Sequence, residues 1–310
     1  MKKILALTLA LVLALSLCAC GGGNADTTTT DNGDAADTAT VEIPPVEDLT
    51  GTDTSTIPGV EDGVLTVGME CTYAPYNWTQ TDDSNGAVPI VNNPGSYANG
   101  YDVMIAQRIC DTYGWKLEVQ AIEWDGLIPA LNAGTIDAVI AGQSMTAGRM
   151  EQVDMAGPYF YASIVCVAKK DSEQAKAKGI SELTGTCTAQ SGTIWYTDCL
   201  PQVEGAQIMA QSESAPAMIM AVESGTVDFI CTDMPTAMGA VAAYPDMKIL
   251  DFTDSDDNFE VDEGEINIGI SVMKGNTELK EAIDSVLSTM TADDFNTLMN
   301  EAIAIQPLSE

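Results

Sequence analysis

The sequence contains no histidine and few basic residues. Of its 310 residues, 12 are Lys or Arg and 46 are Asp or Glu, which gives a formal net charge of −34. Without His, the Ser-His-Asp and Cys-His catalytic arrangements are excluded, and the commonest ligand of transition metals is missing. The strong negative charge argues against general binding to nucleic acid or to anionic lipid. We therefore expect no metal site, no cofactor and no nucleic-acid partner.

Cysteine pairs of the Cys-x-x-Cys type are also absent, so the sequence supports neither a zinc site nor a redox motif. Cys110, Cys166 and Cys231 stand in apolar patterns that favour buried thiols. An extracellular location would permit disulfides, and a bridge between Cys187 and Cys199 is an open alternative.

One apolar run is present, and it is short. It extends from Ile4 to Leu15 after Lys2 and Lys3, too short for a mature transmembrane helix, and it is typical of a secretory signal. The residues from Leu17 to Cys20 resemble a bacterial lipobox, which implies that Cys20 becomes the lipid-modified first residue. The alternative is an ordinary signal peptide that is cut elsewhere. We assign residues 1–20 to the signal peptide and lipobox.

Residues 21–59 contain no Lys or Arg and consist largely of Thr, Asp, Gly, Ala and Pro. Such a segment buries too little apolar surface to offset its ordering entropy, so we expect a disordered acidic tether. No later run is long enough to span a membrane. The sequence therefore predicts a folded module, anchored by lipid at the extracellular face of the cytoplasmic membrane, or periplasmic in a diderm source.

Apolar periodicity in the remainder predicts an α/β fold. The first half reads as strand, helix, strand, helix, strand over residues 64–68, 101–113, 116–121, 126–132 and 136–141, with Asp125 capping the second helix. The pattern restarts with strands at 164–168, 186–189, 206–210 and 227–232, and helices near 192 and at 214–224. A strand at 266–272 and helices at 277–290 and 292–302 complete the chain.

Two similar halves with a returning C-terminal segment predict two lobes, each a mostly parallel sheet flanked by helices. We place lobe 1 at residues 60–161, lobe 2 at 162–266, and the segment that completes lobe 1 at 267–310. The two hinge crossings are expected near Tyr159–Ser163 and Glu263–Ile268.

A Gly-Thr-aliphatic-Asp pattern occurs twice, at residues 134–137 and 225–228, each time before an apolar strand. The first strand leads into a Ser/Thr loop with Arg149, one of only two arginines, and the second leads to Asp233. Ligands of open α/β sheets bind beyond the carboxyl ends of the strands. A cation at one end and an anion at the other suit a small zwitterion, although each pattern alone is also typical of a helix C-cap.

Several short stretches together resemble a known family. In order they lie at residues 70–76, 100–103, 124–131, 144–149, 153–159 and 190–193, followed by Asp228 and Asp233. From Gly63 to Ala304 the chain is similar to the family 3 extracellular solute-binding proteins, the amino-acid-binding lipoproteins of ABC importers. The resemblance implies a type II periplasmic-binding-protein-like fold, a free amino acid as ligand, a membrane permease as partner, and a monomer that works by hinge closure.

The resemblance also implies roles for individual residues. Arg149 would bind the ligand α-carboxylate, because a planar guanidinium donates two parallel hydrogen bonds. Ser144 would assist, as would the turn that contains Thr193 and Ile194, read as a helix N-terminus. Asp233 would bind the α-ammonium group, besides capping the helix that contains Pro235. Backbone groups of Ala141 and Gly142 would complete the site.

The resemblance places the pocket for the ligand side chain at Glu70, Tyr73 and Trp124, with Gln143 less defined. Glu70 favours a cationic or polar ligand side chain, although a solvated acid is also typical of so acidic a chain. Trp124 is alternatively a core residue. The loop from Thr79 to Asn99 is longer than in many relatives, so we expect it to lid the ligand or to contact the transporter.

Two other functions stay open at this point. One is a surface enzyme of the same fold, a carboxylate-based glycosidase or a dehydratase, since acid pairs are numerically easy in this chain. The other is a receptor or sensor module that docks to a separate membrane protein.

Overall fold

The computed structural model describes residues 43–307. The expected signal peptide, Cys20 and the first part of the tether lie outside the described residues. No helix within residues 43–307 has the length and apolar character needed to cross a membrane.

The first of two five-stranded sheets has the order β6-β1-β7-β14-β8. Strand β1 is parallel to β6 and to β7, whereas β14 is antiparallel to both β7 and β8. The strands are β1 (Val64–Met69), β6 (Lys116–Ala121), β7 (Ala138–Val139), β8 (Val153–Phe160) and β14 (Ile268–Met273). We call the elements around this sheet lobe 1.

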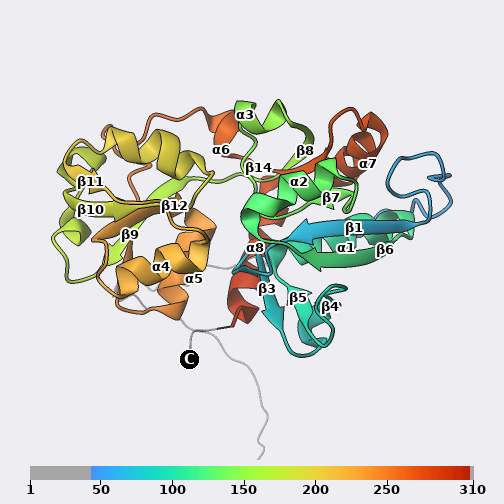
Figure 1. Cartoon of the computed structure of the whole chain (residues 1–310), viewed down its shortest axis with the longest axis horizontal. Coiled ribbons are helices and arrows are strands. Elements are labelled where there is room, and N and C mark those ends of the chain that lie inside the picture. The colour runs from blue at the N-terminus through green and yellow to red at the C-terminus, as the bar shows by residue number, and fades with distance from the viewer. Residues whose placement is uncertain (1–42, 308–310) are drawn as a thin grey trace, which may run out of the picture. The chain divides into compact units, whose positions relative to one another are not determined.

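The second sheet repeats this arrangement in the order β11-β10-β12-β9-β13. Strand β10 is parallel to β11 and β12, and β9 is antiparallel to β12 and β13. The strands are β9 (Ile164–Lys169), β10 (Gly185–Thr188), β11 (Ala206–Ile208), β12 (Phe229–Asp233) and β13 (Met247–Leu250). These elements form lobe 2, on the left in Figure 1, with β1, β6 and α1 of lobe 1 on the right.

The fold class is confirmed: in each sheet four of the five strands run in one direction, and one strand, β14 or β9, is antiparallel to its neighbours. The chain ends β8 at Phe160, crosses, and starts β9 at Ile164, then returns through α6 (Glu263–Ile266) to start β14 at Ile268. A strand that begins where the chain enters from the other lobe must run away from that lobe. This explains why β9 and β14 oppose their neighbours. The carboxyl ends of the other strands of both sheets therefore converge on one place, which we call the interlobe face.

The helices follow the apolar periodicity closely. α1 (Tyr101–Tyr113) ends at Gly114, whose φ of 72° supplies a left-handed C-cap, as the sequence predicts. α4 (Ala215–Glu223), α5 (Met234–Ala243) and α7 (Thr277–Leu287) flank the sheets. The prediction that Asp125 caps α2 (Leu127–Asn132) is wrong, because Asp125 lies within a 3-10 turn and Gly126 holds the N-cap position.

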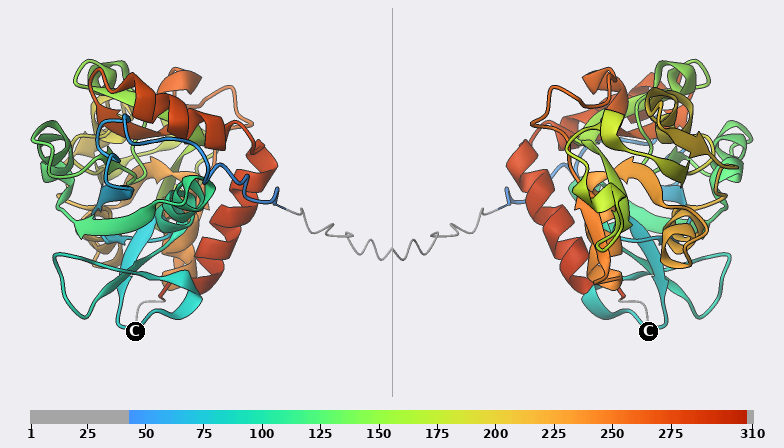
Figure 2. Two further views of the ribbon diagram at one scale, coloured as in Figure 1. Left: turned by 90° about the vertical axis from the view of Figure 1, so that its right-hand side faces the viewer. Right: turned by 90° about the vertical axis from the view of Figure 1, so that its left-hand side faces the viewer.

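The C-terminal helix α8 (Ala292–Ile305) contacts both lobes. It packs against α1 and β8 of lobe 1 and against α5 of lobe 2. Figure 2 shows it in red along one edge in both side views. The domain boundaries at 161 and 266 stay predictions. The segments that connect the two sheets, residues 161–163 and 263–267, are the places where hinge bending is geometrically simplest.

The long loop from Thr79 to Asn99 contributes two strands and the end of a third to a small antiparallel sheet, of order β2-β3-β5-β4. Its strands are β2 (Thr72–Tyr73), β3 (Asn77–Gln80), β4 (Val88–Pro89) and β5 (Tyr97–Asn99). All six cysteines in the described part are buried and free, so Cys187 and Cys199 are not bridged.

The last part of the expected tether is held against lobe 1. The guanidinium of Arg108 donates a hydrogen bond of 2.8 Å to the carbonyl of Pro44, and the amide of Leu49 donates one of 2.8 Å to the carbonyl of Thr112. Arg108, the second arginine of the chain, thus fastens the segment from Ile43 onward to α1.

We predict that Gly100→Ala strongly destabilises the protein. Gly100 has φ 123°, and an added Cβ would lie 2.4 Å from the carbonyl oxygen of Tyr76. The backbone strain and the clash together should cost roughly 3–5 kcal/mol of unfolding free energy, as measured by urea denaturation.

Gly225→Ala is the matched control, because Gly225 has φ 72° but no atom within 4 Å of its added Cβ. It should cost only about 1–2 kcal/mol, the usual penalty of a left-handed residue. Equal losses in the two variants would contradict the assigned role of the Tyr76 contact.

Candidate functional site

Arg149 lies on α3 (Ala147–Met150), a short helix whose N-cap hydroxyl, on Thr146, accepts a hydrogen bond of 3.1 Å from the Arg149 amide. The half-buried guanidinium donates to the carbonyl of Ser144 and, at 3.4 Å, to the carbonyl of Gly192 in lobe 2. Its central carbon lies 5.6 Å from the centroid of the Trp124 ring. Arg149 therefore belongs to lobe 1 and reaches lobe 2.

The charge of Arg149 has no carboxylate partner among the described residues, where every ion pair is made by a lysine. Burial lowers the pKa of Arg149 to about 10, so the group stays cationic at neutral pH. A desolvated cation bonded only to carbonyl oxygens is a natural site for an anion.

Asp233 ends β12 and caps α5, as predicted from the sequence. Its Oδ1 accepts a hydrogen bond of 2.9 Å from the amide of Thr236, and its Oδ2 accepts one of 2.8 Å from the hydroxyl of Tyr76 in lobe 1. The side chain is buried, and burial raises the pKa of the carboxyl. Asp233 thus belongs to lobe 2 and reaches lobe 1.

Two tyrosines join the lobes. Besides the Tyr76–Asp233 bond, the hydroxyls of Tyr73 and Thr236 lie 2.9 Å apart. The two tyrosine rings pack with centroids 4.9 Å apart. Tyr76 stood in a motif stretch, but nothing in the sequence signalled its contact with Asp233.

A buried network fixes the backbone at Gly142. Its amide donates a hydrogen bond of 3.0 Å to the hydroxyl of Tyr159, which donates one of 2.7 Å to Asp102. Asn77 donates to the other carboxylate oxygen of Asp102 at 2.8 Å. The N–H of Gly142 therefore already has an acceptor, so Gly142 can offer its carbonyl to a ligand. The buried Ala141 can also offer its backbone to a ligand.

Gly142 itself is required by geometry, since its φ is 62° and an added Cβ would lie 2.9 Å from the ring of Tyr73. Neighbouring Gln143 is buried and accepts a hydrogen bond of 2.8 Å from the hydroxyl of Ser271. Its side chain thus serves to hold β14 within lobe 1.

Glu70 directly follows β1 and is buried, 7% exposed. Its Oε2 and the Nε2 of the buried Gln190, which follows β10 of lobe 2, both lack a hydrogen-bond partner among the described residues. Burial raises the pKa of Glu70 to about 7, although the nearby Gln190 amide acts to lower it. Gln190 was missed as a candidate, because only the fold brings it near Glu70.

The turn at Gly192 lies against Trp124. Gly192 has φ 68°, and an added Cβ would lie 3.2 Å from the indole Nε1. Trp124 is thus buried at the interlobe face rather than within a lobe core. The hydroxyl of Thr193 donates 2.7 Å to the carbonyl of Gln190, and Ile194 is buried beside it.

A regular helix does not follow this turn, contrary to expectation. Residues Trp195–Cys199 form a π-helical turn, and a 3-10 turn at Leu200–Gln202 follows. Pro201 ends regular hydrogen bonding after so few residues. Any anion contact here rests on individual backbone N–H groups rather than on a long helix dipole.

Taken together, Arg149 and Trp124 of lobe 1 lie against the Gly192 turn of lobe 2, and Tyr73 and Tyr76 lie against Thr236 and Asp233. An arginine without an anionic partner comes from one lobe, and a buried aspartate comes from the other. This arrangement suits a ligand with separated charges.

Known proteins are similar to this chain in sequence and in fold. The L-cystine-binding protein TcyJ of Escherichia coli (strain K12) is 25% identical over 242 residues, 78% of this chain and 82% of that protein. An arginine-bound form of ArgBP from T. maritima superposes with a TM-score of 0.58 at 28% identity, over 75% of this chain and 98% of that one. The ancestral amino acid-binding protein AncCDT-1, described as a precursor of cyclohexadienyl dehydratase, gives a TM-score of 0.62 at 27% identity, over 79% and 97%.

The family model of the bacterial extracellular solute-binding proteins, family 3, matches residues 65–302. This range covers most of both lobes and contains every predicted ligand-binding residue. The chain belongs to the family 3 bacterial extracellular solute-binding proteins.

Proposed function

We propose that this protein captures a free amino acid with a polar or cationic side chain between its lobes and delivers it to the membrane permease of an ABC importer. The observation that carries the proposal is the placement of Arg149 and Asp233. Each belongs to one lobe and makes a hydrogen bond to the other lobe. Relatives that are named for binding cystine and arginine support an amino acid as ligand.

Arg149 would bind the α-carboxylate. A ligand carboxylate would replace the carbonyl oxygens of Ser144 and Gly192 as the acceptor of the guanidinium. It would accept two charge-assisted hydrogen bonds, each worth roughly 1.5–3 kcal/mol. The guanidinium of Arg149 contacts the carbonyl of Ser144 and the Gly192 turn. The ligand carboxylate would find further hydroxyl or N–H donors there, from Ser144, Thr193 and Ile194.

Asp233 would bind the α-ammonium group. Each of its oxygens accepts one hydrogen bond and has a second lone pair for the ligand. The buried carboxylate has no cationic partner within the described residues, so an ammonium group would offset its desolvation. The carbonyls of Ala141 and Gly142 would accept the remaining N–H donors.

The ligand side chain would extend toward Glu70 and Gln190. The unpartnered Oε2 of Glu70 requires an N–H donor, which guanidinium, ammonium and amide side chains all provide. Tyr73 and Trp124 would supply the apolar walls.

Binding would work by population shift. The Tyr76–Asp233 and Tyr73–Thr236 hydrogen bonds already join the lobes, and a ligand held by both lobes would favour this closed arrangement over an open one. The permease would recognise the closed form. No covalent bond changes in this cycle, so we place the protein among binding proteins rather than enzymes, whereas the dehydratase alternative would require turnover.

The location follows from the family and the N-terminal sequence. The family is extracellular, and lipid attachment at Cys20 would hold a monomer at the outer face of the cytoplasmic membrane, or in the periplasm of a diderm. The same anchor would keep the protein close to its permease.

A thermal-shift screen of the natural amino acids tests the proposal as a whole. A ligand at 100 times its dissociation constant should stabilise the protein by about 2.7 kcal/mol. Stabilisation by arginine, lysine, histidine, glutamine or cystine is expected. A protein that no amino acid stabilises, or one that converts a prephenate-like substrate into product, would contradict the proposal.

We predict that Arg149→Ala weakens binding of the amino acid found in this screen by about 2–5 kcal/mol, because the ligand carboxylate is left unpaired in a desolvated place. Isothermal titration calorimetry measures the change. Arg108→Ala is the control, since Arg108 contacts the Pro44 segment far from the interlobe face, and it should leave the affinity unchanged. An Arg149→Ala protein with native affinity would refute the assignment.

Affinity for a cationic amino acid should rise with pH through the pKa of Glu70, about 7, as the carboxylate ionises. Stability without ligand changes in the opposite direction. The raised pKa means that the folded state holds the proton more tightly, so this group's contribution to stability falls as pH rises from about 4.5 to about 7.

Glu70→Gln should remove both pH dependences, as followed by calorimetry and by urea denaturation between pH 5 and pH 8. A Glu70→Gln protein whose affinity and stability keep the native pH profiles would show that other acids, such as Asp102 or Asp233, are responsible.

A further inference from the structure

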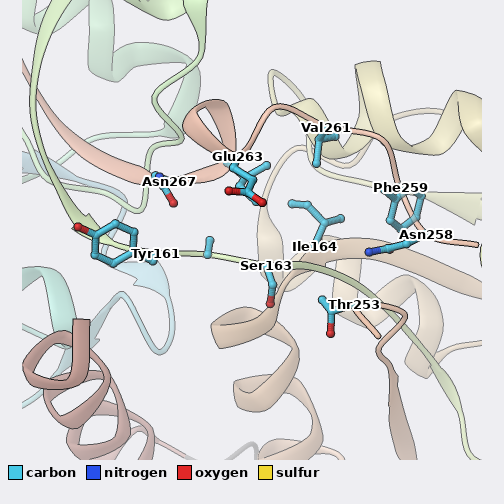
Figure 3. A pocket seen from close by; sticks show the side chains of 11 residues that line it. Tyr161, Ser163, Ile164, Thr253, Asn258, Phe259, Val261, Glu263 and Asn267 are labelled. Atoms are coloured by element: carbon cyan, nitrogen blue, oxygen red, sulfur yellow. The ribbon is translucent and has the colours of Figure 1, made fainter. Parts of the chain in front are cut away.

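A cavity of about 550 Å³ lies between the two hinge crossings, apart from the site described above. Its lining includes Ser163 and Ile164 from the first crossing, and Glu263 and Asn267 from the second. None of the predicted ligand-binding residues lines it. Figure 3 shows Glu263 and Asn267 on the upper segment and Ser163 and Ile164 on the segment below. The volume lies within the range of small-molecule pockets.

The polar groups of the cavity favour a cation. Its lining contains one charged side chain, the carboxylate of Glu263, and no Lys or Arg. The other polar side chains of the lining, on Ser163, Thr253, Asn258 and Asn267, are uncharged. An anion would meet Glu263 unfavourably, whereas an ammonium group would pair with its carboxylate.

Another part of the lining is apolar and aromatic. Ile164, Val261 and Ile266 provide aliphatic surface, and Phe259 and Tyr161 provide rings. A purely inorganic cation would leave these walls without contact. A small organic cation would cover them and gain the attraction between its charge and an aromatic face.

We propose that this hinge cavity binds a small organic ammonium compound with an apolar body, as a second ligand distinct from the amino acid. The net charge of −34 raises the local concentration of such cations near the protein.

The cavity is connected to the interlobe face by backbone hydrogen bonds. The carbonyl of Ser163 accepts a hydrogen bond of 3.0 Å from the amide of Met234, the residue after Asp233. The carbonyl of Asn267 accepts one of 2.8 Å from the amide of Met145, the residue after Ser144. Both crossings therefore hold the loops that carry the candidate site.

A ligand that bridges the two crossings stabilises the lobe arrangement in which the cavity has this shape. In that arrangement Arg149 and Asp233 both contact the opposite lobe. The cation should therefore increase amino-acid affinity, and by linkage the amino acid should increase cation affinity equally. This coupling rests on the proposed amino-acid function, whereas binding of the cation does not.

Calorimetry on the full chain with phenethylammonium as probe tests the site. We expect saturable binding, no binding of the matched anion phenylpropionate, and a loss of at least about tenfold in probe affinity for Glu263→Gln. Glu260→Gln, a nearby exposed acid outside the cavity lining, is the control and should bind the probe as the native chain does.

Asp233→Asn separates the two sites, because Asn keeps the helix cap while the charge that would bind an α-ammonium is removed. Probe affinity should therefore fall less in this variant than in Glu263→Gln. A probe that binds Asp233→Asn weakly and Glu263→Gln normally occupies the amino-acid site, and this outcome overturns the proposal, as does the absence of saturable binding.

The coupling has its own readout. Saturating phenethylammonium should raise the affinity for the screened amino acid at least about fivefold in the native chain and leave it unchanged in Glu263→Gln. Probe binding with unaltered amino-acid affinity would refute the coupling. Failure of every amino acid to bind, with probe binding intact, would refute the transport proposal and not the hinge site.

Discussion

The structure depends on a guanidinium that is held at the junction of two lobes without a carboxylate partner. Arg149 is desolvated enough for its pKa to fall to about 10, and it bonds only to backbone carbonyls in the structure. Such a group is costly to hold unless an anion completes it. Because no carboxylate of the described residues pairs with Arg149, a ligand carboxylate would find a strong partner there and a defined orientation.

Much of the surrounding structure keeps this place rigid. Asp102, Tyr159 and Gly142 form a fully buried chain of hydrogen bonds beneath the interlobe face. Burial raises the pKa of Asp102 to about 6, and the hydrogen bonds from Tyr159 and Asn77 act to lower it. On the opposite side, Asp233 is fixed by its own helix through Thr236. Preorganised groups on both lobes reduce the entropy lost when a ligand binds.

Local patterns were enough to predict the α/β fold class and the places of Arg149 and Asp233 beyond apolar strands. Strands such as β1 and helices such as α1 carry strong periodicity and matching end signals, and Arg149 and Asp233 follow apolar strands at their carboxyl ends. Strand β8 was missed because its Gly-Pro pair interrupts any alternation, and the short turn after Gly192 was overestimated as a helix.

The partners Tyr76 and Gln190 were missed for a different reason. Tyr76 lies 157 positions from Asp233 in sequence, so only the folded chain reveals their contact. The hinge cavity was likewise invisible, because its two walls come from crossings about a hundred residues apart.

The central claim, that the Arg149 guanidinium binds the α-carboxylate of an amino acid, is tested most directly by a double-mutant cycle in which one change is made in the ligand. Calorimetry would compare the screened amino acid with its α-carboxamide, in the native chain and in Arg149→Ala. We expect a coupling energy of at least about 1.5 kcal/mol, because each change removes one side of the same charge-assisted pair. Strictly additive losses would show that the two groups do not meet, and would contradict this account.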